Sequence, residues 1–286
     1  MSMIRVKDLK YTYPGATSPT LYDLSFEVGE QEIVGFLGPS GAGKSTTQKI
    51  LIGLLKGYQG DVEVMGKQVR DWGSEYYEEI GVSFELPNHH QKLTALENLQ
   101  HFGSLYAGER MEPLEALALV DLKDDAHKKV SDFSKGMKIR LNVARSLLHR
   151  PKLLFLDEPT SGLDPVNAQR VKQLVFDLRD EGVTVVITTH DMNVADQLCD
   201  RVAFITSGQL REIDAPAALK ARHGRRVLRI DYGEGGSLTQ EFEIEGLAGN
   251  HEFLNLLSTE HIERMHSQET TLEQVFIDVT GEELKG

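Results

Sequence analysis

Hydrophobic positions fall into two patterns along the first two-thirds of the chain. Short segments are apolar on successive residues, at Glu32–Leu37, Leu153–Leu156 and Val183–Thr188. Strands that are buried on both faces of a largely parallel sheet have this pattern. Other segments space their apolar residues as an amphipathic helix does, at Gly43–Leu55 and Pro165–Arg179. The patterning therefore predicts an α/β unit built on a parallel sheet.

The same unit has weaker signals at its start, middle and end. Met1 to Lys10 alternates like a strand, and the turn at Gly208 separates the short apolar segments Arg201–Ile205 and Leu210–Ile213. Residues from about 87 to 150 show helix-spaced leucines and no strong strand. We therefore predict one domain over residues 1–215, with a helical insertion at about 87–150.

The pattern changes from about residue 216 onward. Val227–Tyr232 and Gln240–Ile244 alternate, which predicts antiparallel strands. The segment Thr271–Gln274 resembles a capping box and predicts a last helix that runs through Val279. Residues 216–286 are thus expected to form a small α+β appendage. Its role stays open between a dimer clamp, a regulatory domain and a docking surface.

A glycine-rich loop joins the first buried strand to the first predicted helix. It matches the phosphate-loop pattern G-x-x-x-x-G-K-[ST] and consists of Gly38, Pro39, Ser40, Gly41, Ala42, Gly43, Lys44 and Ser45. Glycines let backbone N–H groups converge on phosphate oxygens, and the helix N-terminus adds positive potential. Lys44 supplies a cation for the β- and γ-phosphates, and the Ser45 hydroxyl is a hard ligand for Mg²⁺. The strand, loop and helix together predict a nucleoside triphosphate site.

Two carboxylates end the buried strand Leu153–Leu156. Asp157 is predicted to hold Mg²⁺, directly or through water, and Glu158 to polarise the attacking water as a general base. A pair of acids after a strand is weak evidence alone. Downstream of a phosphate loop, it predicts hydrolysis of the nucleotide.

Composition limits the partners. A formal net charge of -13 over 286 residues repels phosphate backbones, so nucleic-acid binding is not expected. The single cysteine, Cys199, fits a reducing compartment. No apolar run approaches the ~18–20 residues that span a bilayer, so a membrane role requires a partner protein. The pair His89 and His90 lacks companions at metal-ligand spacing, which favours a polar loop over a metal site.

Further local features surround these elements in a definite order. Tyr13 precedes the phosphate loop, Glu85 follows the strand-like Gly81–Phe84, and His190 follows the strand Val183–Thr188. A Phe133-led segment continues with Ser134, Lys135, Gly136 and Met137. A second short loop consists of Ser161, Gly162, Leu163 and Asp164. With these features, residues 1–213 resemble the ATP-binding subunits of ABC transporters. That family has a RecA-like P-loop core, an antiparallel β subdomain and a helical insertion.

The resemblance implies a role for each residue in its own subunit. Tyr13 would stack on adenine, and Gly38 to Thr46 would bind the phosphates of ATP. Asp157 and Ser45 would hold Mg²⁺, and His190 would sense the γ-phosphate. Glu85 stands where the family usually has the glutamine of the Q-loop, and would then be a catalytic and metal-binding residue. Gln91 remains an alternative for that position.

The resemblance also implies partners. Ser134 to Met137 form a variant of the family signature, and Ser161 to Asp164 match its D-loop. Each ATP would lie between the phosphate loop of one subunit and the signature of another, in a homodimer or a pair with a related ATPase subunit. An integral-membrane permease on other chains would hold this pair at the cytoplasmic face of the cell membrane.

Alternatives of three kinds remain. The variant signature and the segment Thr271–Phe276 resemble export systems, and import is the nearer alternative. A non-transport ABC ATPase on a ribosome or nucleic acid is disfavoured, because this chain has one phosphate loop and no sustained heptads. A P-loop kinase or GTPase leaves the signature segment, the D-loop and His190 without a role.

Overall fold

The computed structural model describes residues 2–224, 227–268 and 270–282. The chain divides into two compact units, Met1–Ala215 with Glu282–Gly286, and Pro216–Gly281. Each unit has a hydrophobic core cluster of its own.

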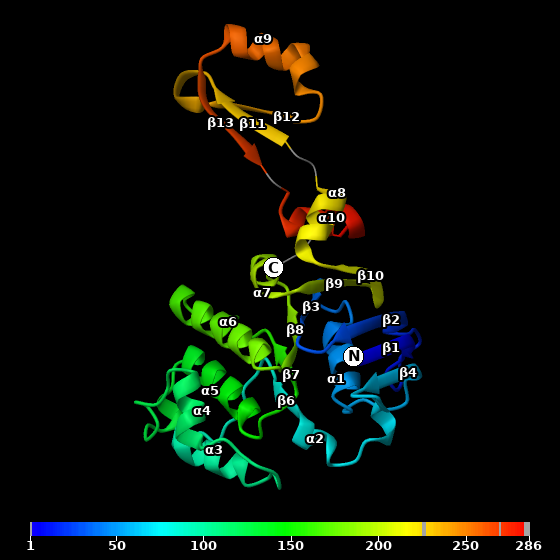
Figure 1. The fold of residues 1–286 in the computed structure, drawn as a ribbon, viewed down its shortest axis with the longest axis vertical. Helices are drawn as coiled ribbons and strands as arrows, with labels where there is room; N and C mark the ends of the chain where they lie inside the picture. The colour runs from blue at the N-terminus through cyan, green and yellow to red at the C-terminus, as the bar shows by residue number, and fades with distance from the viewer. Residues whose placement is uncertain (1, 225–226, 269, 283–286) are drawn as a thin grey trace. The chain divides into compact units, whose positions relative to one another are not determined.

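A mixed sheet forms the centre of the first unit (Figure 1). From edge to edge, its strands are β10 (Gln209–Asp214), β9 (Arg201–Thr206), β3 (Ile33–Leu37), β8 (Thr184–Thr189), β7 (Leu153–Asp157) and β6 (Ile80–Ser83). Neighbouring strands are parallel from β9 to β6, and β10 pairs with β9 antiparallel. All residues of β3 and β8 are buried, because helices and the second sheet cover both faces. The predicted parallel, doubly covered sheet is therefore confirmed.

An antiparallel sheet packs beside it. Its strands are β2 (Leu21–Gly29), β1 (Ser2–Tyr11), β4 (Gln59–Val64) and β5 (Lys67–Gln68), in this spatial order. One core cluster joins Ile4 of β1 and Leu24 of β2 to Phe36 of β3 and to Ile50 on helix α1 (Lys44–Leu51). The phosphate-loop helix is thereby anchored to both sheets.

Helix α1 is shorter than the sequence pattern predicts. It ends at Leu51, and Gly53 takes φ +82° just beyond it. A left-handed glycine after the last turn is a common helix stop. Leu54, which the pattern placed on the helix, is half exposed.

Helices gather at one end of the first unit (Figure 1). These are α3 (Ala95–Gly103), α4 (Pro113–Leu119) and α5 (Lys135–Leu147), with α2 (Tyr76–Glu79) before them. Two more helices cover the sheet, α6 (Pro165–Asp180) and α7 (Met192–Leu198). Helix α3 starts with a complete capping box, in which Thr94 and Glu97 bond each other's backbone N–H groups. Between residues 87 and 150 the structure has the three α-helices α3, α4 and α5 joined by loops, in the region where the leucine spacing predicted helices.

The second unit is built on a small antiparallel sheet. Its spatial order is β12 (Leu238–Glu243), β11 (Val227–Tyr232) and β13 (Ile262–Gln268). Helix α9 (His251–Thr259) packs on one face through Phe253 and Leu256, against Ile230 and Phe242. Helices α8 (Pro216–His223) and α10 (Leu272–Thr280) contact each other. Short 3-10 turns complete the two units at Val69–Asp71, Val130–Asp132, Glu234–Gly236 and Leu247–Gly249.

Helix α10 carries half of the expected capping box. The Thr271 hydroxyl accepts from the Gln274 N–H at 3.2 Å. The Gln274 side chain donates to Asp278 instead of returning to the cap. One bond to the cap still satisfies an orphan N–H group, so the helix starts where the sequence predicted.

Within the three described ranges, no helix combines the length and the apolar character needed to cross a bilayer.

Candidate nucleotide site

The predicted site residues lie on loops that leave one edge of the central sheet. Strands β3, β8, β7 and β6 are parallel, so their carboxyl ends meet at the same edge. The loops after these strands carry the phosphate loop, His190, Glu158 and Glu85 respectively. Ligands of open α/β sheets bind in the crevice beyond these strand ends. The topology therefore brings distant sequence segments to one place.

Glycine is required at two points of the phosphate loop. Gly38 has φ +154° and Gly43 has φ +110°, both outside the range that side chains readily allow. A Cβ at Gly38 would lie 2.0 Å from the Ile205 carbonyl oxygen, and a Cβ at Gly43 would lie 2.6 Å from Leu21 Cδ2. The loop is thus pressed against its neighbours, and its backbone leads directly into the N-terminus of α1.

Lys44 lies inside the phosphate loop. Its ammonium donates to the Gly38 carbonyl at 2.6 Å and to the Pro39 carbonyl at 3.0 Å. Burial lowers the pKa of Lys44, and the nearby Glu158 and Asp157 carboxylates oppose that shift. The cation is therefore within electrostatic reach of both acids, and it is positioned to meet phosphate oxygens in the loop.

Glu158 is the most constrained acid of the site. Its φ of +49° places a residue with a side chain in the left-handed region, a strain that clusters at functional sites. Its carboxylate accepts from the Thr189 hydroxyl at 3.1 Å and from the His190 backbone N–H at 3.0 Å. His190 Nδ1 lies 2.6 Å from the same carboxylate. The group is thereby held in one orientation, as a general base requires.

Asp157 and Ser45 supply hard oxygen atoms at this edge. The Thr188 hydroxyl donates to the Asp157 carboxylate at the end of β7. Ser45 lies exposed in the first turn of α1. Carboxylate and hydroxyl oxygens are the donors that Mg²⁺ prefers, so the residues present fit this ion.

Tyr13 lies beside the start of α1. Its hydroxyl is 3.2 Å from Thr46 Oγ1, and its ring meets Tyr11 edge-to-face with centroids 5.0 Å apart. The side chain remains 36% exposed, which leaves ring surface open for stacking. The structure thus links Tyr13 to the phosphate-loop helix.

Glu85 and Gln91 are both exposed in the loop after β6. The Gln91 amide donates weakly to the His89 carbonyl, at 3.4 Å. His89 itself is buried, with Nε2 2.9 Å from the Lys138 carbonyl of α5. His89 does lie in a loop, as expected, but its ring is buried and fixes this loop to α5.

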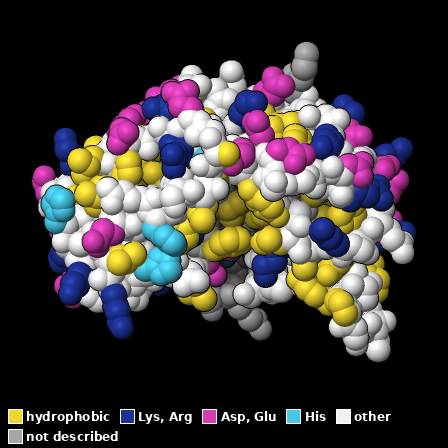
Figure 2. Space-filling model, turned by 90° about the horizontal axis from the view of Figure 1, so that it is seen from below, with side chains coloured by type: hydrophobic (Ala, Val, Ile, Leu, Met, Phe, Trp, Pro, Cys, Tyr) yellow, Lys and Arg dark blue, Asp and Glu magenta, His cyan; other side chains and the backbone are white. Residues whose placement is uncertain are grey.

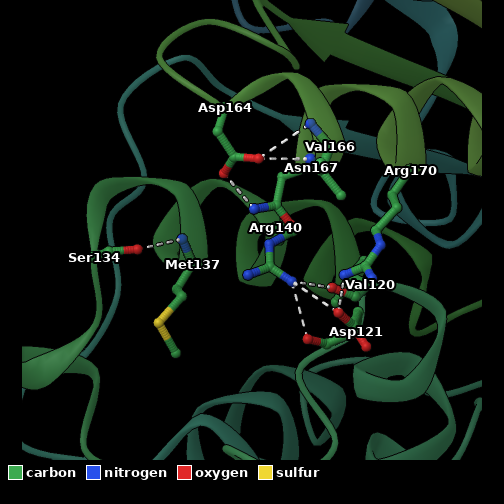
Figure 3. Close-up of polar contacts among 9 residues, drawn as sticks. All are labelled: Val120, Asp121, Ser134, Met137, Arg140, Asp164, Val166, Asn167 and Arg170. Atoms are coloured by element: carbon green, nitrogen blue, oxygen red, sulfur yellow. Dashed lines mark hydrogen bonds and ion pairs between the residues drawn. The ribbon is translucent and has the colours of Figure 1, made fainter.

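The signature and D-loop segments pack against each other within one chain. Ser134 caps α5 by accepting from the Met137 N–H at 3.2 Å, and Asp164 caps α6 by accepting from two N–H groups (Figure 3). A Cβ at Gly136 would lie 3.1 Å from Leu163, and a Cβ at Gly162 would lie 2.9 Å from the Lys135 ammonium. Both cap residues are exposed. These two loops therefore form one surface unit.

Sequence reasoning missed the polar residues that support these loops. Buried Asn142 on α5 donates to Ser83 Oγ at 2.9 Å and to the Phe84 carbonyl at 2.7 Å. It fixes α5 to the segment that carries Glu85. An asparagine within an otherwise apolar helix face was a signal for such a role. Buried Arg140 and exposed Asp121 form a second support, and Asp121 had no sequence signal.

Comparisons with known proteins agree with this geometry. The ABC transporter family model matches residues 21–161. A second model, the C-terminal domain of fluoroquinolone efflux ABC transporters, matches residues 226–269. Among solved structures, the ATP-binding cassette MJ0796 in a dimeric post-hydrolysis state with ADP and Pi has a TM-score of 0.68 and 29% identity. That match covers 74% of this chain and 98% of the cassette.

Similar proteins extend over the whole chain. The fluoroquinolones export ATP-binding protein of Mycobacterium tuberculosis is 54% identical over 284 residues, which cover 99% of this chain and 94% of that protein. The bacitracin transport ATP-binding protein of Bacillus licheniformis is 34% identical over 82% of this chain and 76% of its own length. None of these names favours an ATPase of ribosomes or nucleic acids. The chain therefore belongs to the ABC transporter family, as an ATP-binding, ATP-hydrolysing subunit of the export type.

Proposed function

We propose that this subunit powers the efflux of fluoroquinolones through a separate membrane permease. The observation that carries the proposal is the 54% identity to the mycobacterial export protein over 99% of the chain. This likeness includes the second unit, where the fluoroquinolone efflux model matches residues 226–269. A likeness restricted to the ATPase unit would have supported transport without suggesting a cargo.

In this proposal, each residue at the sheet edge acts on ATP. Gly38 to Thr46 bind the phosphates, and Tyr13 stacks on adenine. Ser45 and Asp157, with Glu85 nearby, would hold Mg²⁺, which neutralises charge on the phosphates. Glu158 accepts a proton from the attacking water. His190, whose Nδ1 contacts the Glu158 carboxylate, responds to the γ-phosphate.

The signature acts on a second subunit. Ser134 to Met137 form the exposed start of α5, and its N–H groups can face a phosphate held by a partner. Cassettes of this family form dimers, as the two dimeric structures of the related cassette indicate. We therefore propose a homodimer, or a pair with a related ATPase subunit, in which the signature and the D-loop complete the partner's site. ATP stabilises the closed pair, and hydrolysis reopens it.

A surface near Glu85 suits a membrane partner. Figure 2 views the side of the first unit at which α2 and α3 lie, and hydrophobic side chains gather there in a hollow. Exposed apolar side chains on α2 and in the loops after β6 and α3 are Tyr77, Phe84, Leu86 and Leu105. Leu86 is 82% exposed. Clustered apolar exposure marks protein contacts, so we assign permease docking to this surface, at the cytoplasmic face of the membrane.

The two units have different roles in this proposal. We propose that residues 1–215 are the ATPase domain, with its helical insertion at about 87–150, and that residues 216–286 are an accessory or regulatory domain. The two core clusters support this division, because each unit buries its own apolar residues.

Transport in membrane vesicles tests the proposal. Inverted vesicles would contain this chain together with the membrane protein encoded beside it. We expect ATP-dependent uptake of a fluoroquinolone, followed by its own fluorescence, and loss of uptake with Lys44→Ala. The matched control is Lys49→Ala, a lysine on the exposed side of α1. Uptake that is equal with and without ATP would contradict the function.

A further inference from the structure

An ion cluster joins the helices that begin at the signature and at the D-loop. Arg140 lies on α5, six residues after the cap Ser134, and Arg170 lies on α6, six residues after the cap Asp164. Asp121 lies between these two arginines (Figure 3). The two helices are therefore connected at corresponding points, shortly behind the two loops.

Asp121 contacts both arginines in different ways. Arg140 Nη1 donates to the backbone carbonyls of Val120 at 2.8 Å and Asp121 at 2.9 Å. These carbonyls follow the last turn of α4, so Arg140 caps that helix with a positive charge. The Asp121 carboxylate lies 3.9 Å from Arg140 Nη1 and accepts a hydrogen bond from Arg170. One residue thus links α4, α5 and α6.

Asp121 also has an unusual backbone conformation. Val120 is the C-cap of α4, and Asp121 follows it with φ +56°. Glycine occupies this left-handed position most easily, and Asp and Asn tolerate it better than other residues with a side chain. Glycine would also fit this place, but it could not make the carboxylate contacts with Arg140 and Arg170.

We propose that Asp121 is a positioning residue, which fixes the signature loop against the D-loop so that both meet the partner's nucleotide as one surface. The inference rests on the proposed dimeric function. The direct contacts of Gly136 with Leu163 and of Gly162 with Lys135 set the loops at their tips. The Asp121 link holds the same two helices together one to two turns after their caps. The two helices therefore resist rotation relative to each other.

ATP-driven dimerisation in a Glu158→Gln background tests this role. Asp121→Asn removes the charge and tolerates the left-handed backbone. An exposed ion pair changes an equilibrium by up to about fivefold, and a dimer contains two copies, so we expect the dimer Kd to rise by up to about 25-fold. ATP affinity of the monomer should not change. The effect should shrink in high salt, because exposed charges are screened.

Two further variants separate positioning from stability. Asp121→Gly also fits the left-handed backbone, so its Tm should stay near that of Asp121→Asn while its dimer weakens to the same extent. Glu115→Gln breaks the similarly exposed pair of Glu115 with Arg150, which does not reach α6, and should leave the dimer unchanged.

Each remaining outcome contradicts a defined claim. If Glu158→Gln alone gives no ATP-dependent dimer, the proposed function fails and this inference fails with it. If that dimer forms and Asp121→Asn matches Glu115→Gln, the positioning role of Asp121 is wrong and the proposed function stands.

Discussion

The nucleotide site at the sheet edge differs in burial and bonding from the surface formed by the signature and D-loop segments, Ser134–Met137 and Ser161–Asp164. At the sheet edge, Lys44 and Glu158 are largely shielded and bonded to their own chain. In the signature and D-loop surface, Ser134 and Asp164 are exposed, and their hydrogen bonds are to groups in the first turns of α5 and α6. In the proposed function, the first region is half of a nucleotide site and is complete within one subunit. The second is a surface that acts only on the nucleotide of a partner subunit.

This contrast explains how one chain can bind ATP and still depend on pairing. A strained, hydrogen-bonded carboxylate is oriented before any partner arrives. Exposed helix N-termini gain an anion only when a partner brings one. Binding should therefore depend on the first region, and assembly on the second.

The largest expected effect comes from the first region. Glu158→Gln should lower steady-state ATP hydrolysis by about 10²–10⁴-fold, the usual cost of losing a general base. ATP binding should persist, because the phosphate loop is unchanged. The measurement is hydrolysis rate beside equilibrium ATP binding, with Glu181→Gln, an exposed glutamate at the end of α6, as the control. Normal turnover in Glu158→Gln would remove this residue from the chemistry.

The link between the Glu85 loop and α5 should be sensitive to acid. Burial lowers the pKa of His89 from 6.5 to about 4, and its Nδ1 has no acceptor within the described structure. As pH falls below 6.5, His89 of the unfolded chain binds a proton, whereas His89 of the folded chain binds it only near pH 4. About 3 kcal/mol of stability should therefore be lost across this window.

Urea unfolding at several pH values measures this loss. His89→Gln keeps an N–H donor for the Lys138 carbonyl and cannot be protonated, so its stability should vary less with pH. The exposed His127→Gln should behave as the wild type does. An equal pH dependence in wild type and His89→Gln would exclude His89 as the cause.

Substitutions of Tyr13 test whether the sheet-edge site also binds the nucleotide by ring stacking. Loss of a stacking ring weakens nucleotide binding by about tenfold, so Tyr13→Ala should raise the Kd for ATP by that factor. Tyr13→Phe keeps the ring and loses only the contact with Thr46, so its Kd should stay near the wild-type value. Similar defects in both variants would show that the hydroxyl matters and that stacking does not.

The smallest effect concerns Glu85. A carboxylate binds Mg²⁺ more strongly than an amide, so Glu85→Gln should stay active and need a few-fold more free Mg²⁺ for half-maximal hydrolysis. Unchanged Mg²⁺ curves, together with a large defect in Gln91→Ala, would assign the Q-loop role to Gln91.

The two regions also differ in how far sequence predicts them. The buried strands, the phosphate loop and the carboxylates were predictable, because periodicity and glycine spacing are local signals. The support by Asn142 and Asp121 was not, because it depends on which helices meet in space. Helix α9 and strand β13 were missed as well, since each is short and mostly exposed. The family, fold and ATPase function predicted from the motifs are confirmed, and the individual residue roles stay predictions.

The central claim is that the signature acts on the partner's nucleotide. Its most direct test is Ser134→Arg in the Glu158→Gln background, with ATP binding to the monomer and ATP-driven dimerisation measured on the same preparation. The account predicts that monomer binding stays at the level of Glu158→Gln and that the dimer disappears, because bulk and charge then block the start of α5. Loss of ATP binding by the monomer, or a dimer of unchanged stability, would contradict it.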